Sequence, residues 1–213
     1  MKKIYKCLLA TSLSLAFTQS NASVVVLNFE GIANSTAVGN YYNGGAGTNY
    51  GVQFSPATLA IIDQDAGGTG NFANEPSANT VMFFLSATNS ILNVAAGFDT
   101  GFSFFYSSQQ AASVRVFSGL NATGTLLGSL NLGAQYNQNC SGDPTGQYCN
   151  WTAVGVNFNG IAQSIDFGGT ANRVAFDDIT FGSSEAGGGT QVPLPATAGL
   201  LALGLLGLAR RKS

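Results

Sequence analysis

Short apolar runs of about four to eight residues recur along residues 24–184, and clusters of Gly, Asn, Asp and Ser separate them. Some runs alternate between apolar and polar side chains: Val114 and Val116 would face one side of a strand, and Arg115 the other. One buried and one solvent-exposed face is typical of antiparallel sheets. About ten such strands, without a long helix among them, predict an all-β fold: a two-sheet antiparallel β-sandwich, jelly-roll-like. The expected strands cover residues 24–29, 50–54, 58–62, 80–85, 102–106, 113–117, 125–130, 152–158, 163–167 and 173–181.

Phenylalanine is the main candidate for the core between the two sheets, since the chain has 15 Phe and one Trp. Burying one such ring stabilises a fold by about 2–3 kcal/mol. We expect these rings to fill the inter-sheet space rather than to line a ligand groove. The expected core rings are Phe29, Phe54, Phe102, Phe104, Phe117, Phe158, Phe167, Phe176 and Phe181.

Residues 1–22 have the features of a secretory signal peptide. Three lysines within the first six residues precede a short apolar run over residues 7–17, and small residues follow it just before Ser23. The run is shorter than the about 20 residues that span a membrane as a helix. We therefore expect an exported protein whose β-sandwich domain covers residues 23–184.

Cysteine usage agrees with an oxidising compartment. Removal of the leader removes Cys7 and leaves Cys140 and Cys149. The residues between them include an Asp-Pro pair and two glycines, which favour a turn that brings the two thiols together. We predict a Cys140–Cys149 disulfide, which for a closed loop of about ten residues contributes roughly 2.5–3 kcal/mol. A redox or metal-binding pair is the alternative, which the long spacing and the lack of another thiol disfavour.

The C-terminal segment has three parts in a fixed order. A Gly-rich linker, residues 185–191, precedes the motif Val192-Pro193-Leu194-Pro195-Ala196, and an apolar stretch follows over residues 196–209. The last part is a basic cluster of Arg210, Arg211 and Lys212. A helix over residues 196–209 would be about 21 Å long at 1.5 Å per residue, short of the roughly 30 Å hydrocarbon core. We expect one short transmembrane helix with its three cations on the cytoplasmic side and the folded body outside.

This order of paired prolines, apolar helix and terminal basic cluster resembles the PEP-CTERM sorting signal of Gram-negative bacteria. The motif in that family is usually Val-Pro-Glu-Pro, and Leu194 here stands in place of the glutamate. The resemblance covers residues 192–213 and implies an exosortase-type sorting enzyme as a partner, which cuts near the motif. It also implies transient anchoring in the inner membrane and delivery to the bacterial envelope, the cell surface or the extracellular matrix. A plain tail anchor is the alternative, but it would not explain the two prolines just outside the membrane.

The composition excludes several functions. The chain has no histidine, which removes Ser-His-Asp catalysis, Cys-His catalysis and histidine metal sites. Its basic residues cluster at the termini, and only Arg115 and Arg173 accompany the ten acids between them, so we expect no nucleic-acid partner. Carboxylates are the remaining groups for catalysis, and none lies in a recognisable signature. We therefore predict no catalytic residue and no enzyme, with a carboxylate-based glycan hydrolase as the least favoured alternative.

Acidic residues mark both ends of the predicted sandwich. Asn28-Phe29-Glu30-Gly31 opens it, and residues 176–181 close it with the pair Asp177-Asp178. Both ends resemble those of jelly-roll domains like carbohydrate-binding modules, which implies that these acids come together. Converging carboxylates need a counter-charge, and their hard oxygen atoms suit Ca2+. Glu30, Asp177 and Asp178 are the candidate ligands of a structural Ca2+, with solvated or turn-capping acids as the alternative.

The direction of the two aspartates stays open at this point. If Ile179 and Phe181 face the core, the period of the strand turns Asp177 inward and Asp178 outward. If Phe176 faces the core, the assignment reverses, unless a bulge lies at the pair. Both aspartates are therefore candidates.

Aromatic and amide side chains on loops suggest a carbohydrate surface. Tyr41, Tyr42 and Trp151 lie on or beside loops rich in Asn and Gln; Tyr136 lies just before the cysteine loop and Tyr148 within it. Aromatic faces pack against sugar C–H groups and amides bond hydroxyls, so Tyr41, Tyr42 and Trp151 are the candidate ligand-binding residues. We predict a non-catalytic surface or matrix protein that binds or organises exopolysaccharide. A purely structural protein that self-associates through its weakly charged surface is the alternative.

Overall fold

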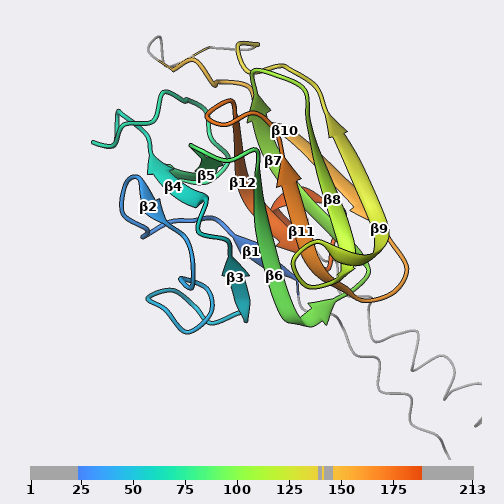
Figure 1. Cartoon of the computed structure of the whole chain (residues 1–213). Coiled ribbons are helices and arrows are strands. Elements are labelled where there is room, and N and C mark those ends of the chain that lie inside the picture. The colour runs from blue at the N-terminus through green and yellow to red at the C-terminus, as the bar shows by residue number, and fades with distance from the viewer. Residues whose placement is uncertain (1–23, 139–140, 142–145, 189–213) are drawn as a thin grey trace, which may run out of the picture.

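The computed structural model describes residues 24–138, 141 and 146–188, which form two antiparallel sheets packed face to face (Figure 1). The seven-stranded sheet contains β1 (Val25–Leu27), β2 (Thr36–Ala37), β4 (Thr58–Ile62), β5 (Thr80–Phe84), β7 (Gly101–Ser108), β10 (Thr152–Asn157) and β12 (Val174–Phe181). The five-stranded sheet contains β3 (Val52–Phe54), β6 (Asn89–Phe98), β8 (Ala112–Gly119), β9 (Thr123–Leu132) and β11 (Ala162–Gly168). The all-β, two-sheet prediction is confirmed, and the only helix among the described residues is the three-residue 3-10 turn η1 (Ala186–Gly188).

The first and last strands lie side by side in the seven-stranded sheet (Figure 1). This sheet has the order β10-β7-β12-β5-β4-β2, and β1 pairs with the C-terminal part of β12, from Ile179 to Phe181. β5 pairs with the N-terminal part of β12, so β1 and β5 share the edge that β7 leaves free. The order of the other sheet is β3-β6-β11-β8-β9, so successive strands from β5 to β8 alternate between the sheets. Such crossings between two packed sheets are typical of jelly-roll sandwiches.

Phenylalanine rings from both sheets meet at the centre of the core. The Phe167 ring of β11 lies between Phe102, Phe104 and Phe176 of the opposite sheet, with ring centroids 6.0, 5.9 and 4.9 Å apart and interplanar angles of 65–68°. These are edge-to-face contacts, which aromatic rings favour. All four rings are fully buried, so the inter-sheet core is aromatic, as the sequence predicts.

Phe117 is the exception among the predicted core rings. Val114 and Val116 of β8 are buried, and strand alternation therefore turns Phe117 to the outer face of the five-stranded sheet. There it is half-buried, and the guanidinium of Arg115 lies 5.7 Å from the centre of its ring. The prediction of a core position for Phe117 is wrong because the two valines already set the inward face of this strand.

The ten-residue strand β6 is absent from the expected strands. Leu92 and Val94 alternate inward and are buried, but Ala95, Ala96 and Gly97 follow, and these residues have little preference for strands. Pairing with β3 on one side and β11 on the other holds the segment extended. Its neighbours, rather than its own composition, make it a strand.

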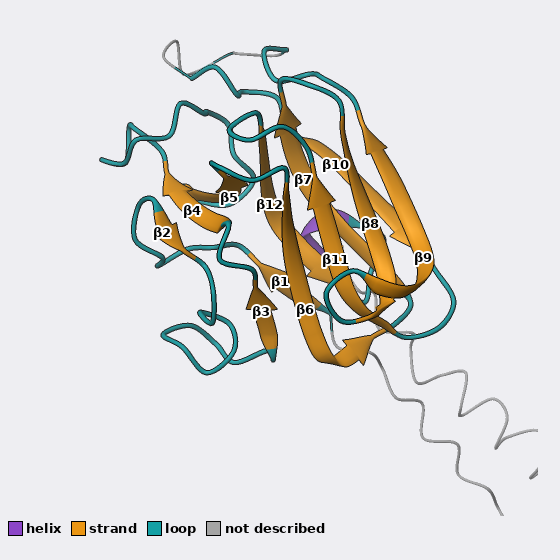
Figure 2. Cartoon of the chain, viewed as in Figure 1, coloured by secondary structure: helices purple, strands orange, loops and turns teal. Residues whose placement is uncertain are grey.

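The expected signal peptide (1–22), transmembrane helix (196–209) and sorting motif lie outside the described residues. Within the part of the chain that the structure describes, no helix has the length and hydropathy of a membrane span. After β12 the chain turns back onto the outer face of the seven-stranded sheet, where η1 (purple in Figure 2) packs against it.

Candidate functional site

The acidic pair on β12 lies at a β-bulge. The pairing of β12 with β7 shifts register between Asp177 and Thr180, and Asp178 has a φ of 47°. This left-handed residue lets Phe176 and Ile179, on either side of the pair, both face the core, where both are fully buried. Strand alternation alone could not decide which residues of this strand face the core, and the bulge accounts for both. With Phe176 and Ile179 facing the core, Asp177 points to the outer side of the sheet.

Asp177 is fully buried on that outer side, because the chain just before β5 covers it. The N–H and the hydroxyl of Ser77 donate to its carboxylate at 2.8 Å, and the N–H of Asp178 donates at 2.7 Å. Burial is the main cause that raises the pKa of Asp177 to about 7; the hydrogen bonds from Ser77 oppose it, and the charge of Asp178 adds to it. Asp177 is therefore a buried acceptor that holds the Ser77 segment and titrates near neutral pH.

Glu30 binds the same segment from the end of the first strand. Its Oε1 accepts hydrogen bonds from the N–H groups of Asn79 and Thr80 at 2.9 and 2.8 Å, and its Oε2 accepts one from the Thr80 hydroxyl at 3.2 Å. Burial, and then the charge of Glu30, raise the pKa of Asp178. The acids from the two ends of the fold therefore meet around residues 77–80.

The calcium prediction gains no support from this arrangement. Among residues 24–138, 141 and 146–188, no group of three or more Asp, Glu or Cys side chains is placed to hold a metal ion. The hydrogen bonds of Glu30 and Asp177 match the turn-capping alternative. A Ca2+ site at Glu30, Asp177 and Asp178 stays a prediction.

An open groove of about 360 Å3 lies beside Glu30. Its other lining residues are Gly31, Ile32, Ala33, Ile62, Ala66, Asn79 and Thr80. Among the described residues, the lining includes no aromatic side chain that would pack against a sugar, and the Glu30 carboxylate is occupied by the hydrogen bonds just described.

Tyr42, one of the predicted ligand-binding residues, belongs to the core. Its side chain is only 5% exposed, and its ring lies edge-on to Phe29 with the centroids 6.1 Å apart. Its hydroxyl accepts a hydrogen bond from the buried N–H of Phe29 at 2.8 Å, which satisfies a backbone donor just beyond Leu27, the last paired residue of β1. Tyr41 is half-buried, and its hydroxyl donates to the Glu30 carbonyl at 3.0 Å. Both tyrosines thus use their hydroxyls to fix the end of the first strand.

Two loops pair with each other over the outer face of the seven-stranded sheet (Figure 2). One joins β4 to β5 and the other joins β9 to β10. The N–H groups of Gln147 and Tyr148 donate to the Asn71 carbonyl at 2.8 and 3.1 Å, and the N–H of Ala73 donates to the Tyr148 carbonyl at 3.0 Å. The two loops therefore behave as one unit.

Trp151, the third predicted ligand-binding residue, fastens these loops. It is half-buried, its Nε1–H donates to the Ala73 carbonyl at 3.0 Å, and its ring lies edge-on to Phe72. Phe72 forms a second, small hydrophobic cluster with Val81 and Ala175 under the loops. Trp151 lies far along the chain from Tyr41 and Tyr42 and packs in this separate cluster, whereas Tyr41 and Tyr42 pack with the main core.

A different set of side chains forms an aromatic–amide surface on the paired loops. It consists of Asn71, Tyr136, Gln147 and Tyr148 on these loops, together with Arg173 from the turn before β12. The two tyrosine rings lie 5.5 Å apart, the Asn71 amide donates to the Gln147 amide oxygen at 3.2 Å, and both amide residues are exposed. A cavity of about 30 Å3 lies beneath Tyr148. That volume suits a water molecule and not a sugar ring, so a glycan would have to bind on the surface itself.

Arg173 gives this surface its positive charge. Its guanidinium donates to the Gln109 amide oxygen and lies close enough to the Tyr148 hydroxyl to lower the pKa of that group, which burial raises. Arg115 and Arg173 are the two basic residues that the structure describes, and Arg115 is paired with Asp166. Within the described ranges, Arg173 forms no ion pair with a carboxylate.

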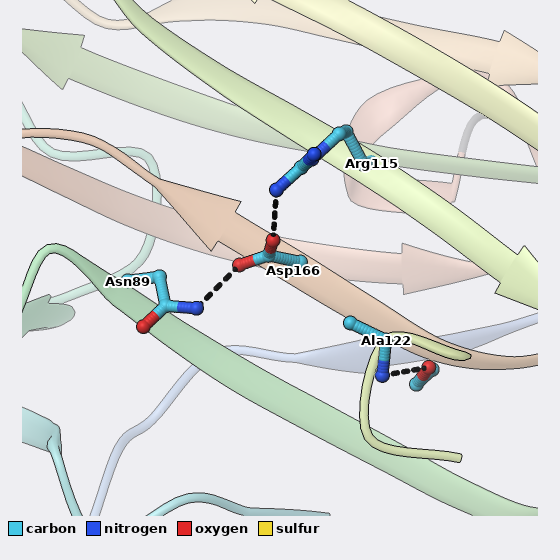
Figure 3. A network of polar contacts seen from close by, with 5 residues as sticks. Asn89, Arg115, Ala122 and Asp166 are labelled. Atoms are coloured by element: carbon cyan, nitrogen blue, oxygen red, sulfur yellow. Dashed lines mark hydrogen bonds and ion pairs between the residues drawn. The ribbon is translucent and has the colours of Figure 1, made fainter. Parts of the chain in front are cut away.

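The other arginine takes part in a polar network on the outer face of the five-stranded sheet (Figure 3). Asp166 is only 3% exposed, and its carboxylate accepts hydrogen bonds from the Arg115 guanidinium at 2.6 Å and from the Asn89 amide at 3.0 Å. Next to it, the N–H of Ala122 in the β8–β9 turn donates to the Ser164 hydroxyl at 2.9 Å. The network joins β6, β8 and β11 side by side and has a structural role.

The predicted disulfide is described at one end. Cys149 is buried, and its N–H donates to the Tyr136 carbonyl at 2.8 Å. Cys140 lies outside the described residues. The Cys140–Cys149 disulfide therefore stays a prediction.

Sequence reasoning missed two residues that matter here. Ser77 holds Asp177 through two donors, but a serine in a loop has no pattern that indicates a partner 100 residues away. Arg173 could have been singled out, since it and Arg115 are the two basic residues between the chain ends, but its position beside Tyr148 depends on the loop pairing.

Comparison with protein families finds one match. Residues 191–213 match the PEP-CTERM protein-sorting motif, so the chain contains this motif, which implies an exported protein and exosortase-type processing. The match includes the residues predicted to form the signal: Val192, Pro193, Leu194, Pro195, Ala196, Arg210, Arg211 and Lys212. These residues lie beyond the part of the chain that the structure describes. The comparison with curated proteins finds no match.

Solved structures similar to this chain include adhesin domains and carbohydrate-binding modules. The K2 cleaved adhesin domain of Lys-gingipain is 13% identical with a TM-score of 0.49, over 76% of this chain and 98% of that one. A family 6 carbohydrate-binding module is 17% identical with a TM-score of 0.39, over 76% and 93%. CsCBM6-3 from Clostridium stercorarium, solved with cellobiose, is 16% identical with a TM-score of 0.38, over the same shares. At these identities the likeness concerns the fold alone.

Proposed function

We propose that this is a non-catalytic protein of the bacterial cell surface or extracellular matrix that binds polysaccharide. The match to the sorting motif at residues 191–213 supports its export and its handling by an exosortase-type enzyme. In this proposal, a helix over residues 196–209 anchors the chain in the inner membrane until processing. A Cys140–Cys149 disulfide then stabilises the exported body.

The aromatic–amide surface is the single observation that best supports polysaccharide binding. Tyr136 and Tyr148 provide adjacent rings, and Asn71 and Gln147 provide exposed amides that can donate to and accept from sugar hydroxyls. Rings with polar groups beside them are the usual composition of a site that binds a ligand with apolar and hydroxylated faces. The two paired loops hold these groups in place before a ligand arrives, which reduces the entropy lost on binding.

The charge of Arg173 favours a polysaccharide that contains carboxylate groups, such as a uronic-acid polymer. A guanidinium pairs with a carboxylate through two parallel hydrogen bonds, and Arg173 has no acidic partner among the described residues. The acidic charge of the whole chain opposes such a polymer at long range. Salt screens that repulsion beyond about 8 Å at physiological ionic strength, whereas a direct ion pair is screened much less.

The test is affinity electrophoresis of the exported protein in gels that contain a uronic-acid polymer, a neutral polysaccharide or neither. We expect retardation by the uronic-acid polymer, loss of it in Tyr148→Ala, and a loss of at least about tenfold in affinity in Arg173→Gln. Tyr50→Ala is the matched control, because Tyr50 is an exposed tyrosine outside this surface. Equal migration of all variants in all gels would remove polysaccharide binding from the proposal.

One observation favours the structural alternative. Among the described strands, β9 is an edge strand that pairs only with β8. The chain has no charged residue and no proline between Arg115 and Asp143. Leu126 on this strand is 52% exposed. Uncharged edge strands tend to pair with other chains. Sedimentation of the wild type and of Leu126→Lys at rising concentration tests this alternative. Self-association through β9 would be lost in the variant, whereas polysaccharide binding would not be.

A further inference from the structure

Residues 183–188, here called the strap, follow β12 and cross the outer face of the seven-stranded sheet. The hydroxyl of Ser103 donates to the Ser183 carbonyl at 2.9 Å, and the N–H of Gly187 donates to the Thr180 hydroxyl at 3.1 Å. Ser103 and Thr180 alternate with core residues and therefore point outward, yet both are fully buried. The strap is what covers them.

The strap lies over a row of small residues that runs across the strands. Gly155, Ser103 and Thr180 pair across β10, β7 and β12, and Val26 on β1 continues the row. A Cβ atom at position 155 would collide with the carbonyl oxygen of Ser184, and one at Gly101 would lie 2.8 Å from its nitrogen. Only glycine allows another backbone to approach a strand this closely.

The strap ends beside the first strand of the fold. A Cβ atom at Gly188 would lie 3.3 Å from the side chains of both Val24 and Val26. The strap therefore contacts β10, β7, β12 and β1. All of its contacts form only when these four strands have paired. Docking also brings the end of the strap next to the beginning of the described chain.

The docked strap shortens the tether between the sandwich and the sorting motif. Three residues separate Gly188 from Val192, so at about 3.5 Å per residue the motif begins within roughly 14 Å of the strap. If the strap left the sheet, the tether would start at Gly182 and reach roughly 35 Å by the same measure. Cleavage by a protease needs a segment that can leave the fold, and a docked backbone opens only by local unfolding.

We propose that the strap confines proteolytic removal of the sorting segment to the chain beyond Gly188, so that the mature protein keeps the strap docked with its end beside β1. As long as the sandwich is folded, docking protects the peptide bonds within residues 183–188 from envelope proteases. Cleavage on the far side of the strap keeps residues 183–188 in the mature protein. This inference does not depend on polysaccharide binding.

The experiment is limited digestion of the full exported chain with elastase, which cuts after small residues such as Ala186, followed by mass measurement of the fragments. In the wild type we expect cuts beyond Gly188 and protection of the bond after Ala186. In Gly155→Val, whose side chain fills the row under the strap, cleavage after Ala186 should become at least tenfold faster. Gly133→Ala is the control, because a Cβ atom there meets nothing within 4 Å.

A milder variant keeps the test decisive if Gly155→Val fails to fold. Ser103→Ala removes only the hydroxyl that donates to Ser183 and should raise cleavage after Ala186 about threefold, with a melting curve that shows the variant folded at the temperature of digestion. A wild-type protein cut after Ala186 as fast as either variant would overturn the proposal. So would full protection of that bond in every folded variant.

Discussion

Ser77 and Asp177 lie 100 residues apart in the chain, and Ser77 donates both its N–H and its hydroxyl to the Asp177 carboxylate at 2.8 Å. The Ser77 hydroxyl also lies 3.1 Å from the Asn28 carbonyl at the end of the first strand. One serine thus connects the first strand, the last strand and the chain before β5. The buried carboxylate at its centre makes stability depend on pH.

The free energy of unfolding should fall as the pH rises from about 4 to 7. The unfolded chain releases the proton of Asp177 near its ordinary pKa of 3.8, whereas the folded protein retains it up to about pH 7. Folding is therefore favoured below pH 4, and this contribution, on the order of 4 kcal/mol, is lost as the pH passes the folded pKa. Asp177→Asn has no titratable group at this position, so its free energy of unfolding should change less than that of the wild type between pH 4 and pH 8. Urea denaturation at pH 4 and at pH 8 measures these free energies of unfolding. Asp99→Asn is the control, because Asp99 is exposed. A wild-type free energy of unfolding that stays constant or rises with pH would contradict the prediction.

Removal of the charge on Asp178 should lower the pKa of Asp177, because that charge is one cause of the upward shift. Asp178→Asn keeps a residue that tolerates the left-handed backbone at this bulge, where φ is 47°. We expect the variant to be more stable than the wild type at pH 8 in EDTA, since Glu30 and Asp178 then no longer repel each other.

Melting curves in Ca2+ and in EDTA extend the experiment to the calcium prediction. A rise in melting temperature with Ca2+ in the wild type and not in Asp178→Asn would support an ion there, and identical curves would remove it.

Tyr42→Phe should destabilise the fold without changing polysaccharide binding. The variant leaves the buried N–H of Phe29 without its acceptor, a loss of about 1–3 kcal/mol. Tyr41→Phe is the matched control and should cost less, because the carbonyl that its hydroxyl reaches is only partly buried. Chemical denaturation and affinity electrophoresis decide the point. If Tyr42→Phe had unchanged stability but bound no polysaccharide, the prediction would be wrong and Tyr42 would be a ligand-binding residue.

Arg115 and Asp166 should show a positive coupling in a double-mutant cycle. Arg115→Gln removes the cation from a carboxylate that is only 3% exposed, and Asp166→Asn removes the charge that Arg115 faces. Since the arginine side chain is 52% exposed, we expect a coupling of roughly 1 kcal/mol rather than the larger value of a buried pair. Strictly additive effects of the two changes on the free energy of unfolding would exclude it.

The exported protein should contain a Cys140–Cys149 disulfide. Peptide mapping with and without reduction would identify the joined fragments, and free thiols in the exported protein would refute the bond. Reduction should lower the free energy of unfolding by roughly 2.5–3 kcal/mol, as expected for a closed loop of about ten residues. The cytosolic precursor, kept reduced, provides the comparison.

Much of the fold could be predicted because strand period and core position are local. Val114, Arg115 and Val116 alternate, and both valines are buried as expected. The bulge at Asp177 could not be derived from the sequence, because the alternation is satisfied either with Phe176 inward or with Ile179 inward. Phe176 and Ile179 can both face the core because β12 pairs with β7 on one side and with β5 and β1 on the other.

The candidate site was harder to predict, because it depends on loops that fold onto distant strands. Tyr42 lies in a Gly- and Asn-rich segment typical of an exposed loop, and it is buried because Phe29 needs a hydrogen-bond acceptor. Trp151 was expected to contact a ligand, but its indole N–H donates to a carbonyl of another loop. In each case the partner is distant in sequence, and a local pattern contains no information about it.

The pairing of Val25 with Phe181 also determines when this chain can acquire its structure. The strand that completes the seven-stranded sheet is the last one to be synthesised and the last to cross the membrane, so the earliest exported residues wait for nearly all the others. Closure over so long a separation is slow compared with local contacts. The seven-stranded sheet therefore closes late, after nearly all of the described chain has become available for pairing.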